Sequence, residues 1–207
     1  MLGSRCARES VNIGSVNAVP TNEPSDEALF LAYTRGDRAA FRALFQRYEP
    51  LLTRVMRRGM FNDAIVGDLV QQTFLQVHRA RLDFDTSRKF RPWLLTIAMN
   101  LKRQHFRTLK RRPEDPTELT DRVVPAVPAY DPTRTDDARK LHEALARLPD
   151  NQREVLVLHW LEGLPMNEVG DVLGASRSAV KVRAHRAYER LRTILESMGV
   201  TSPGGPA

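Results

Sequence analysis

The sequence predicts an all-α protein in which two small helical domains are joined by a flexible, proline-rich linker. Through most of the chain, apolar residues recur at positions i, i+3, i+4 and i+7, which is the period of a helix with one buried face. No sustained stretch alternates between apolar and polar residues in the way that a half-buried strand does. Residues 113–135 contain five prolines, which cannot continue a helix and favour an extended linker.

These composition changes divide the chain of 207 residues. We expect a flexible leader at residues 1–24, a first domain at 25–112, the linker at 113–135, a second domain at 136–197 and a disordered tail at 198–207. Hydrophobic residues make up 42% of the chain, which is enough to build cores.

The cysteine content and the hydropathy indicate where the protein works. Cys6 is the sole cysteine, so the chain can form neither an internal disulfide nor a cysteine metal cluster, and a reducing cytoplasm fits. No window of 18 residues is apolar enough for a transmembrane helix, and the leader lacks the apolar core of a secretory signal. We therefore expect a cytoplasmic protein.

The charge indicates the class of partner. Lys and Arg number 32 against 25 Asp and Glu, which gives a formal net charge of +7. A basic protein of this kind favours a polyanionic partner, and nucleic acid is a better candidate than an anionic membrane surface.

Two helices with one apolar face each are predicted in the first domain. The first follows Gly36, with Asp37 as its N-cap, and the second covers residues 63–80. The predicted buried positions are Phe41, Leu44, Phe45, Tyr48, Leu51, Leu52, Val55 and Met56 in the first helix and Val66, Leu69, Val70, Thr73, Phe74 and Val77 in the second.

A third helix is predicted from Pro92, which suits a first turn, to Arg112. At 100° per residue it has an apolar side of Leu94, Ile97, Ala98, Leu101 and Leu109 and an opposite stripe of Thr96, Asn100, Arg103, Arg107 and Lys110. Lys102 falls toward the apolar side, so we expect it to extend its amine to the solvent or to lie at an edge.

The polar stripe predicts contact with phosphates. Residues 102–112 hold six Lys and Arg and no acid, whereas a helix face that is merely solvated usually mixes both signs. Asn100 can both donate to and accept from a base edge. Phe90, Trp93 and Phe106 are expected mainly in the core, although one exposed aromatic ring could stack on an unpaired base.

The second domain has the pattern of a helix-turn-helix. One helix ends with Ala144, Leu145 and Leu148, and a second is expected to begin at Asp150 as its cap, to bury Val155, Leu156, Leu158 and Trp160, and to end at Gly163. A short helix at 165–173, a turn at Gly174 and a helix capped by Ser176 follow. The outward positions of this last helix are Arg177, Lys181, Arg183, His185 and Arg186. Such a face suits a major groove, although a helical hairpin with a basic solvent face has the same pattern.

Four segments of the chain, in this order and spacing, resemble the bacterial RNA polymerase sigma factors of the extracytoplasmic-function (ECF) group. They are DLVQQTFLQVHRA (68–80), FRPWLLTIAMNLKRQ (90–104), LPDNQREVLVLHWLEGLP (148–165) and VGDVLGASRSAVKVRAHRAYERLR (169–192). The resemblance covers roughly residues 25–197. It implies two helical domains, region 2 and region 4, joined by a flexible linker. Region 2 would bind core RNA polymerase and melt the promoter −10 element, and region 4 would bind the −35 element.

The resemblance also implies a role for individual residues, and the loop at 85–90 matches the family's specificity loop, which holds a flipped −10 base. Expected contacts with core polymerase are Asp68, Gln71 and Gln72. Expected contacts with −10 DNA are Arg88, Lys89, Phe90, Trp93, Thr96, Asn100, Arg103, Arg107 and Lys110. Expected contacts with −35 DNA are Ser176, Arg177, Lys181, Val182, Arg183, His185 and Arg186.

The chain departs from the family's pattern at four positions. His78 stands where Trp or Tyr is frequent, and Pro165 stands where Ser or Thr usually begins the first helix of the helix-turn-helix. Val182 can touch a thymine methyl but cannot hydrogen-bond, which predicts an unusual −35 preference. Gly170 replaces an Ala and is expected to weaken its helix by about 1 kcal/mol.

Two other functions fit parts of the sequence. A stand-alone helix-turn-helix regulator would explain the second domain, but a ligand-sensing first domain has no need of an acid-free cationic stripe. An enzyme acting on nucleic acid finds little support, because the five histidines are scattered and no metal-ligand pair or phosphate-binding glycine loop is present. We therefore expect no catalysis, no cofactor, no metal and no small-molecule substrate.

The resemblance also implies partners and a location. The expected partners are core RNA polymerase, promoter DNA and an anti-sigma protein. The protein is expected with the nucleoid in the cytoplasm, or held at the membrane when an anti-sigma protein is anchored there.

Overall fold

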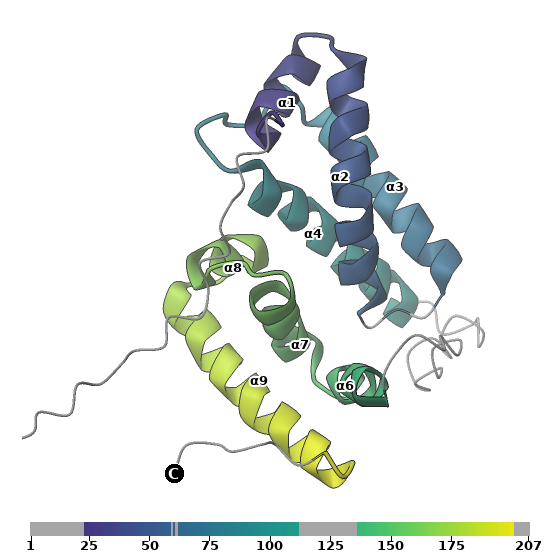
Figure 1. The fold of residues 1–207 in the computed structure, drawn as a ribbon, viewed down its shortest axis with the longest axis vertical. Coiled ribbons are helices and arrows are strands. Elements are labelled where there is room, and N and C mark those ends of the chain that lie inside the picture. Colours follow the sequence, from purple (N-terminus) through teal and green to yellow (C-terminus); the bar gives the residue numbers. More distant parts are fainter. Residues whose placement is uncertain (1–22, 59, 61, 112–135, 201–207) are drawn as a thin grey trace, which may run out of the picture.

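Helices make up most of the residues that the computed structural model of the protein describes, which are 23–58, 60, 62–111 and 136–200. No strand occurs among these residues, and the all-α prediction is confirmed (Figure 1). The N-terminal bundle consists of α1 (Asp26–Thr34), α2 (Arg38–Arg57), α3 (Asp63–Arg79) and α4 (Phe90–Arg111). The C-terminal bundle consists of α6 (Asp136–Ala146), α7 (Asp150–Leu156), the π-helical turn η1 (Val157–Leu161), α8 (Met166–Leu173) and α9 (Arg177–Ser197).

The predicted flexible leader and linker lie almost wholly outside the described residues. The tail predicted from residue 198 lies partly within them, and there the prediction is wrong for its first residues. Met198 N–H donates to Ile194 O at 3.2 Å and Val200 N–H to Leu195 O at 3.0 Å, so residues 198–200 close the end of α9.

Side-chain caps start the first three helices. The Ser25 hydroxyl accepts from Ala28 N–H at the start of α1, and the Asn62 side chain accepts from Ala64 N–H at the start of α3. The predicted cap of α2 is confirmed, because Asp37 Oδ1 accepts from Ala39 N–H at 2.8 Å. Each cap satisfies an N–H group that has no partner within its helix.

The core of the N-terminal bundle follows the predicted helical faces closely. All six predicted positions of α3 are buried. In α2 the prediction fails at Phe45, which is 38% exposed. Its ring lies 4.6 Å from that of Phe74, between ring centroids, so it covers the rim of the core rather than entering it.

The first turn of α4 is held by a contact that the sequence pattern did not predict. Glu27 of α1 accepts a hydrogen bond from Phe90 N–H at 2.9 Å through its Oε1. A carboxylate at this place satisfies one of the free N–H groups of α4 and complements the positive end of its dipole. Pro92 lies in the same turn, as predicted, where its missing N–H has no effect.

The start and the end of the α7–η1 segment both differ from the prediction. Pro149 occupies the N-cap position of α7 without a side-chain cap, while the Asp150 carboxylate binds Arg153 instead. Trp160 was expected in the core but is 66% exposed, with its ring stacked on that of Tyr188. The π-helical turn explains part of this, because it rotates the last residues of the segment relative to a regular helix.

The helix-turn-helix is formed by α8 and α9. Gly174 ends α8 with a φ of 62°, a left-handed conformation that glycine adopts without strain. The predicted cap of α9 is confirmed, since the Ser176 hydroxyl accepts from Ala179 N–H at 3.3 Å. Pro165 precedes α8 and gives it no side-chain cap.

Gly170 is required by this turn, and the expectation that it merely weakens α8 is corrected. A Cβ atom at residue 170 would lie 2.7 Å from the carbonyl oxygen of Ala175, which is closer than carbon and oxygen pack. The same turn is closed by a hydrogen bond from Ala175 N–H to Gly170 O at 2.9 Å. Glycine therefore lets the two helices of the motif approach each other.

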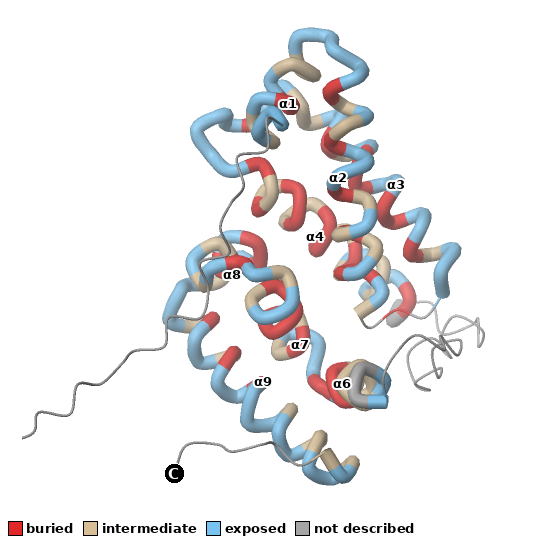
Figure 2. The backbone as a smooth tube through the Cα atoms, viewed as in Figure 1, coloured by how far each residue is buried: buried red, intermediate tan, exposed pale blue. Residues whose placement is uncertain are grey.

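The two bundles pack against each other through α4 and α8 (Figure 1). One hydrophobic cluster runs from Phe30 and Leu94 in the N-terminal bundle to Leu158 and Val169 in the C-terminal bundle. Figure 2 shows the corresponding run of buried residues where α4 faces α7 and α8. A second, small cluster of Leu145, Leu148, Leu156 and Ala187 joins α6, α7 and α9.

We predict that Gly170→Ala destabilises the protein although alanine is the better helix former. The added methyl group meets backbone that cannot move freely, which should lower the free energy of unfolding by about 1–3 kcal/mol. Gly67→Ala in α3 is the matched control, because a Cβ there meets nothing within 4 Å. It should raise the free energy of unfolding by about 0.5–1 kcal/mol. Urea denaturation of both variants makes the comparison, and a stabilised Gly170→Ala variant would contradict it.

Candidate nucleic-acid interface

The exposed face of α9 carries the cations predicted for −35 DNA. Arg177, Lys181, His185 and Arg186 are exposed, and Arg183 is half-buried. The opposite side of this helix packs in the core through the buried residues Val180, Ala184 and Ala187. Val182 is 50% exposed beside the cations, which leaves its methyl groups free to meet a partner. The structure thus places these predicted residues around the part of the second helix of the helix-turn-helix that does not face the core.

The stripe of α4 is less accessible than the sequence predicted. Asn100 and Arg107 are exposed, but Thr96 and Arg103 are half-buried. The Thr96 hydroxyl donates to Pro92 O at 2.8 Å, and the Asn100 side-chain oxygen lies 3.5 Å from Arg103 Nη1. The side chain of Lys110, the last predicted member of the stripe, lies outside the described part of the chain.

The loop before α4 is held by Asp85. Its Oδ1 accepts from Ser87 N–H at 3.0 Å and from the Ser87 hydroxyl at 2.7 Å. These hydrogen bonds hold the pKa of the Asp85 carboxyl below its usual value, because they favour the charged form. The resulting turn leaves Arg88 and Lys89 exposed, as a contact with DNA would require.

The structure corrects the role expected for Phe90. The resemblance implied a contact with −10 DNA, but the ring is fully buried, in agreement with the expectation that these aromatic rings lie mainly in the core, and it packs against Phe30 at 5.0 Å and Tyr48 at 5.5 Å between ring centroids. Trp93 is half-buried against Phe84, at 4.7 Å between ring centroids, and keeps part of its surface accessible. The packing of these aromatic rings therefore holds the start of α4 in place. Trp93 is the one whose side chain remains partly accessible.

A cleft of about 430 Å³ opens beside this loop. One wall comes from the loop and the start of α4, and the other from α8 of the C-terminal bundle. The lining residues are Arg88, Lys89, Pro92, Trp93 and Thr96 on the first wall and Asn167, Glu168 and Asp171 on the second.

Three acids of the C-terminal bundle form ion pairs with cations of the N-terminal bundle, and the sequence did not predict these pairs. Lys89 Nζ lies 2.6 Å from Glu168 Oε1, Arg103 Nη2 lies 2.9 Å from Glu154 Oε2, and Arg54 Nη2 lies 3.2 Å from Glu162 Oε2. Arg91 also donates to the backbone oxygen of Glu162. No local sequence signal marks these acids, because Glu154 and Glu168 are single carboxylates on short helices and Glu162 is a single carboxylate in the turn after η1.

Lys102 is buried at the contact between the bundles, which corrects the expectation of an exposed or edge position. It is 4% exposed, and its Nζ donates to Val55 O at 3.1 Å and to Arg58 O at 2.8 Å. Val157 and Leu158 help to enclose it from the C-terminal bundle. Burial, and after it the nearby Arg153 guanidinium, lower its pKa to about 7, because both disfavour the ammonium form.

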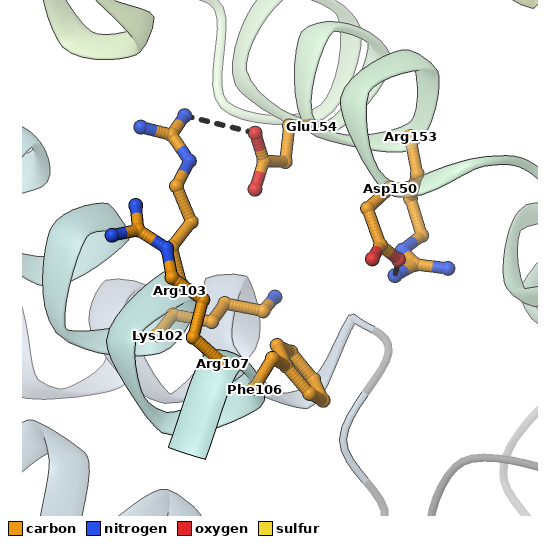
Figure 3. Close-up of a pocket in the computed structure, with 7 residues that line it drawn as sticks. All are labelled: Lys102, Arg103, Phe106, Arg107, Asp150, Arg153 and Glu154. Carbon is orange, nitrogen blue, oxygen red and sulfur yellow. Dashed lines mark hydrogen bonds and ion pairs between the residues drawn. The ribbon is translucent and has the colours of Figure 1, made fainter. Parts of the chain in front are cut away.

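Figure 3 shows the adjoining pocket of about 180 Å³. Arg103 and Arg107 reach into it from α4, and Asp150, Arg153 and Glu154 face them from α7. The dashed lines mark the pairing of Arg103 with Glu154 and of Arg153 with Asp150. Charges of both signs line this space, so each cation from α4 that enters it meets acids as well as cations.

The predicted contacts with core polymerase lie together on α3. Asp68, Gln71 and Gln72 are exposed at spacings of three and four residues, on one side of the helix. Within the described residues there is no group of three His, Cys, Asp or Glu side chains that could hold a metal ion. The same residues include no helix with the length and apolarity to cross a bilayer.

Comparisons with known proteins agree with this organisation. The family model "Sigma-70 region 2" matches residues 44–112, and "Sigma-70, region 4" matches residues 144–193. The RNA polymerase sigma factor CarQ of Myxococcus xanthus is 38% identical over 160 residues, which cover 77% of this chain and 91% of that protein. The ECF RNA polymerase sigma factor SigM of Mycobacterium tuberculosis is 31% identical over 175 residues, 84% of this chain and 86% of the relative.

A solved structure shares the arrangement. CnrH in complex with the cytosolic domain of CnrY has a TM-score of 0.65 and 28% identity, over 84% of this chain and 99% of CnrH. RpoE of Bartonella quintana, solved with the anti-sigma factor NepR, has a TM-score of 0.66 at 22% identity and shows the likeness of fold.

The two helical domains and these relatives define a sigma factor of the sigma-70 type. Within that class, the chain belongs to the ECF group of RNA polymerase sigma factors. Sigma factors bind core RNA polymerase and promoter DNA and direct the initiation of transcription, which excludes the reading as a stand-alone regulator.

We predict a pH-dependent stability that depends on Lys102. Between about pH 7 and the ordinary lysine value of 10.5, the unfolded chain binds a proton at Lys102 that the folded chain does not. The free energy of unfolding should therefore rise with pH across this window, by up to about 1.4 kcal/mol per pH unit. It should fall again as the pH drops toward 7.

Urea denaturation at several pH values measures this slope. The Lys102→Met variant is the comparison, since it has no group to titrate at that place, whereas every other group is unchanged. Equal slopes for the two proteins between about pH 7 and 10 would show that the amine is not buried in the folded chain.

Proposed function

We propose that this sigma factor reads the −35 element with α9, opens and holds the −10 element with α4 and its preceding loop, and docks on core polymerase through the exposed face of α3. The observation that carries this assignment is the placement of cations on one face of each of two helices, each fixed by a buried apolar side; α4 contains no acid, and neither does α9 from Arg177 to Arg186. Such faces are suited to phosphates, which supply the missing countercharge.

The face of α9 suits duplex DNA. A helix fits the major groove, where Arg and Lys can donate to the O6 and N7 atoms of guanine. Arg177 and Lys181 are exposed near the start of the helix, the part that usually meets base edges in a helix-turn-helix. Val182 adds an apolar surface for a thymine methyl group, while Arg183, His185 and Arg186 extend the positive face and Ser176 holds its first turn.

The face of α4 suits DNA that has been opened. Asn100 presents an amide that can pair with an unstacked base, and Arg107 lies on the same side for the phosphate backbone. Trp93, Arg88 and Lys89 line the cleft beside it, where an extruded base could stack on the indole. Thr96 and Arg103 continue this face once their present partners are released.

The partners and the location follow from the family. CnrH was solved with the cytosolic domain of CnrY, and this supports an anti-sigma protein as a partner of the present chain. The protein would act in the cytoplasm on the nucleoid, or wait at the membrane if that partner is anchored there. It would have no catalytic activity of its own, since the polymerase performs the chemistry.

Reconstituted transcription tests the proposal. Purified protein is added to bacterial core RNA polymerase on genomic DNA, and the 5′ ends of the transcripts are sequenced. We expect new start sites that share two upstream elements and that are absent with core enzyme alone. Tight binding of the free protein to promoter DNA, with no change in the activity of core polymerase, would overturn the proposal.

We predict that Asn100→Ala impairs opening of the promoter more than binding of the −35 element. Loss of an amide that pairs with an unstacked base should cost about 1–3 kcal/mol, or roughly tenfold to a hundredfold in the formation of the open complex. Permanganate footprinting measures opening, and a mobility shift with −35 duplex measures binding.

Gln104→Ala is the matched control, because Gln104 is an exposed amide one turn further along α4 and outside the predicted stripe. It should leave both measurements nearly unchanged. Equal losses of opening and of −35 binding in the Asn100→Ala variant would remove the role given to Asn100.

A further inference from the structure

Helix α1 has no part in the proposed function, although it lies directly against the loop that leads into α4 (Figure 1). The match to Sigma-70 region 2 begins at residue 44, so α1 lies outside it. The side chains of α1 nevertheless contact the residues on both sides of the loop at 85–89. These contacts indicate that α1 determines where the loop lies.

Phe30 of α1 packs against both ends of the loop. Its ring lies 5.0 Å from that of Phe84, which precedes the loop, and 5.0 Å from that of Phe90, which follows it, between ring centroids. All three of these side chains are buried. Aromatic rings at such separations attract each other beyond the effect of the area that they bury. One side chain of α1 therefore holds the loop at both of its ends.

A polar contact from the first turn of α1 adds to this packing. The half-buried Glu27 accepts from Phe90 N–H at 2.9 Å through its Oε1. The neighbouring Asp26 accepts from Arg47 Nη1 at 2.6 Å and from the Tyr48 hydroxyl, which fixes this turn of α1 on α2. Glu27 therefore holds the backbone at the residue where the loop ends and α4 begins.

The loop is ordered internally, but its internal contacts do not place it on the bundle. Arg88 N–H donates to Asp85 O at 3.0 Å, and the Ser87 hydroxyl donates to the Asp85 carboxylate at 2.7 Å. These bonds shape a turn within residues 85–88 and reach no other element. A loop that is both shaped and placed in advance loses less conformational entropy when it binds. The placement comes from α1.

We propose that Glu27 is a positioning residue for the −10 loop, and that α1 holds this loop so that Arg88, Lys89 and Trp93 meet an extruded base in one fixed arrangement. This inference rests on the proposed function, which assigns an extruded base to the cleft beside the loop. Glu27 acts through the Phe90 amide and does not itself touch DNA. Its role requires a hydrogen-bond acceptor at this place, whereas direct readout of a base by a carboxylate would require Glu27 to face the DNA.

Amide hydrogen exchange tests the contact without any DNA. Exchange at Phe90 N–H is followed by NMR in the isotope-labelled, full-length protein and in its Glu27→Ala and Glu27→Gln variants. Loss of the acceptor should speed exchange at Phe90 on the order of tenfold, because a hydrogen bond to a charged group contributes at least that factor. The side-chain oxygen of Gln can still accept, so Glu27→Gln should exchange at nearly the native rate.

Glu23→Gln is the matched control. It removes the same charge shortly before α1, but Glu23 is 71% exposed and pairs with Arg47 rather than with the loop. Exchange at Phe90 should be unchanged in this variant. Equal exchange rates at Phe90 in the native and Glu27→Ala proteins would overturn the proposal.

Promoter opening tests the consequence for DNA. The start sites found by reconstituted transcription supply a promoter, and a set of templates carries one base change at each position of its −10 element. Permanganate footprinting with core polymerase compares opening of the original and the altered templates. Glu27→Ala should lose discrimination at one position on the order of tenfold, while Glu27→Gln and Glu23→Gln should keep it. A mobility shift with −35 duplex should give the native affinity for all variants.

The pattern of losses separates positioning from other roles of Glu27. Native discrimination in Glu27→Ala, or equal losses on every template and on the −35 duplex, would overturn the proposal, because the second result is that of a general loss of structure. A new base preference in Glu27→Gln would also overturn it, in favour of direct contact with DNA. If the native protein starts no transcription, the proposed function fails together with the role in reading a base, and exchange at Phe90 reports separately whether Glu27 holds the loop.

Discussion

The packing of α4 against the C-terminal bundle is the contact on which the arrangement of the whole chain depends. Leu94, Leu95, Ala98 and Met99 are buried almost completely, because helices of both bundles surround α4. At about 25 cal/mol per Å² of apolar surface, covering such a helix from several sides is a substantial stabilisation. This same helix carries the stripe on its opposite side, where Thr96 and Arg103 are half-buried, so packing also covers part of the proposed binding face.

The ion pairs determine how the two bundles are aligned. The apolar part of the contact has no directional preference, whereas the Lys89–Glu168 and Arg103–Glu154 pairs fix one alignment of α4 with α7 and α8. Ion pairs that remain partly exposed each contribute little to stability, and added salt weakens them.

The sequence was sufficient to predict the fold class and the faces that repeat with the helical period. The predicted positions on α3 and the caps at Asp37 and Ser176 follow local rules, so the pattern located them correctly. Three predictions were wrong for the same reason, namely the DNA contact of Phe90, the exposed position of Lys102 and the merely weakening effect of Gly170. The surroundings of these residues come from segments distant in the chain or across a turn, and a helical period carries no information about those neighbours.

The residues of the candidate site likewise fall into those that the sequence could locate and those that it could not. The cations of α9 could be located from the sequence, because they need only the helix that carries them. The acids at Glu154, Glu162 and Glu168 could not, since their importance appears only when the second bundle is placed on the first. Trp160 lies between these cases, because its exposure results from a π-helical turn that has no clear sequence signature.

A distance measurement between spin labels tests the central claim most directly, namely that the two bundles of the free chain pack against each other through α4 and α8. In a Cys6→Ser background, Gln46→Cys on α2 and Arg190→Cys on α9 place one label on an exposed position of each bundle. The account predicts one narrow distance distribution in the free protein. A broad distribution in the free protein would contradict it.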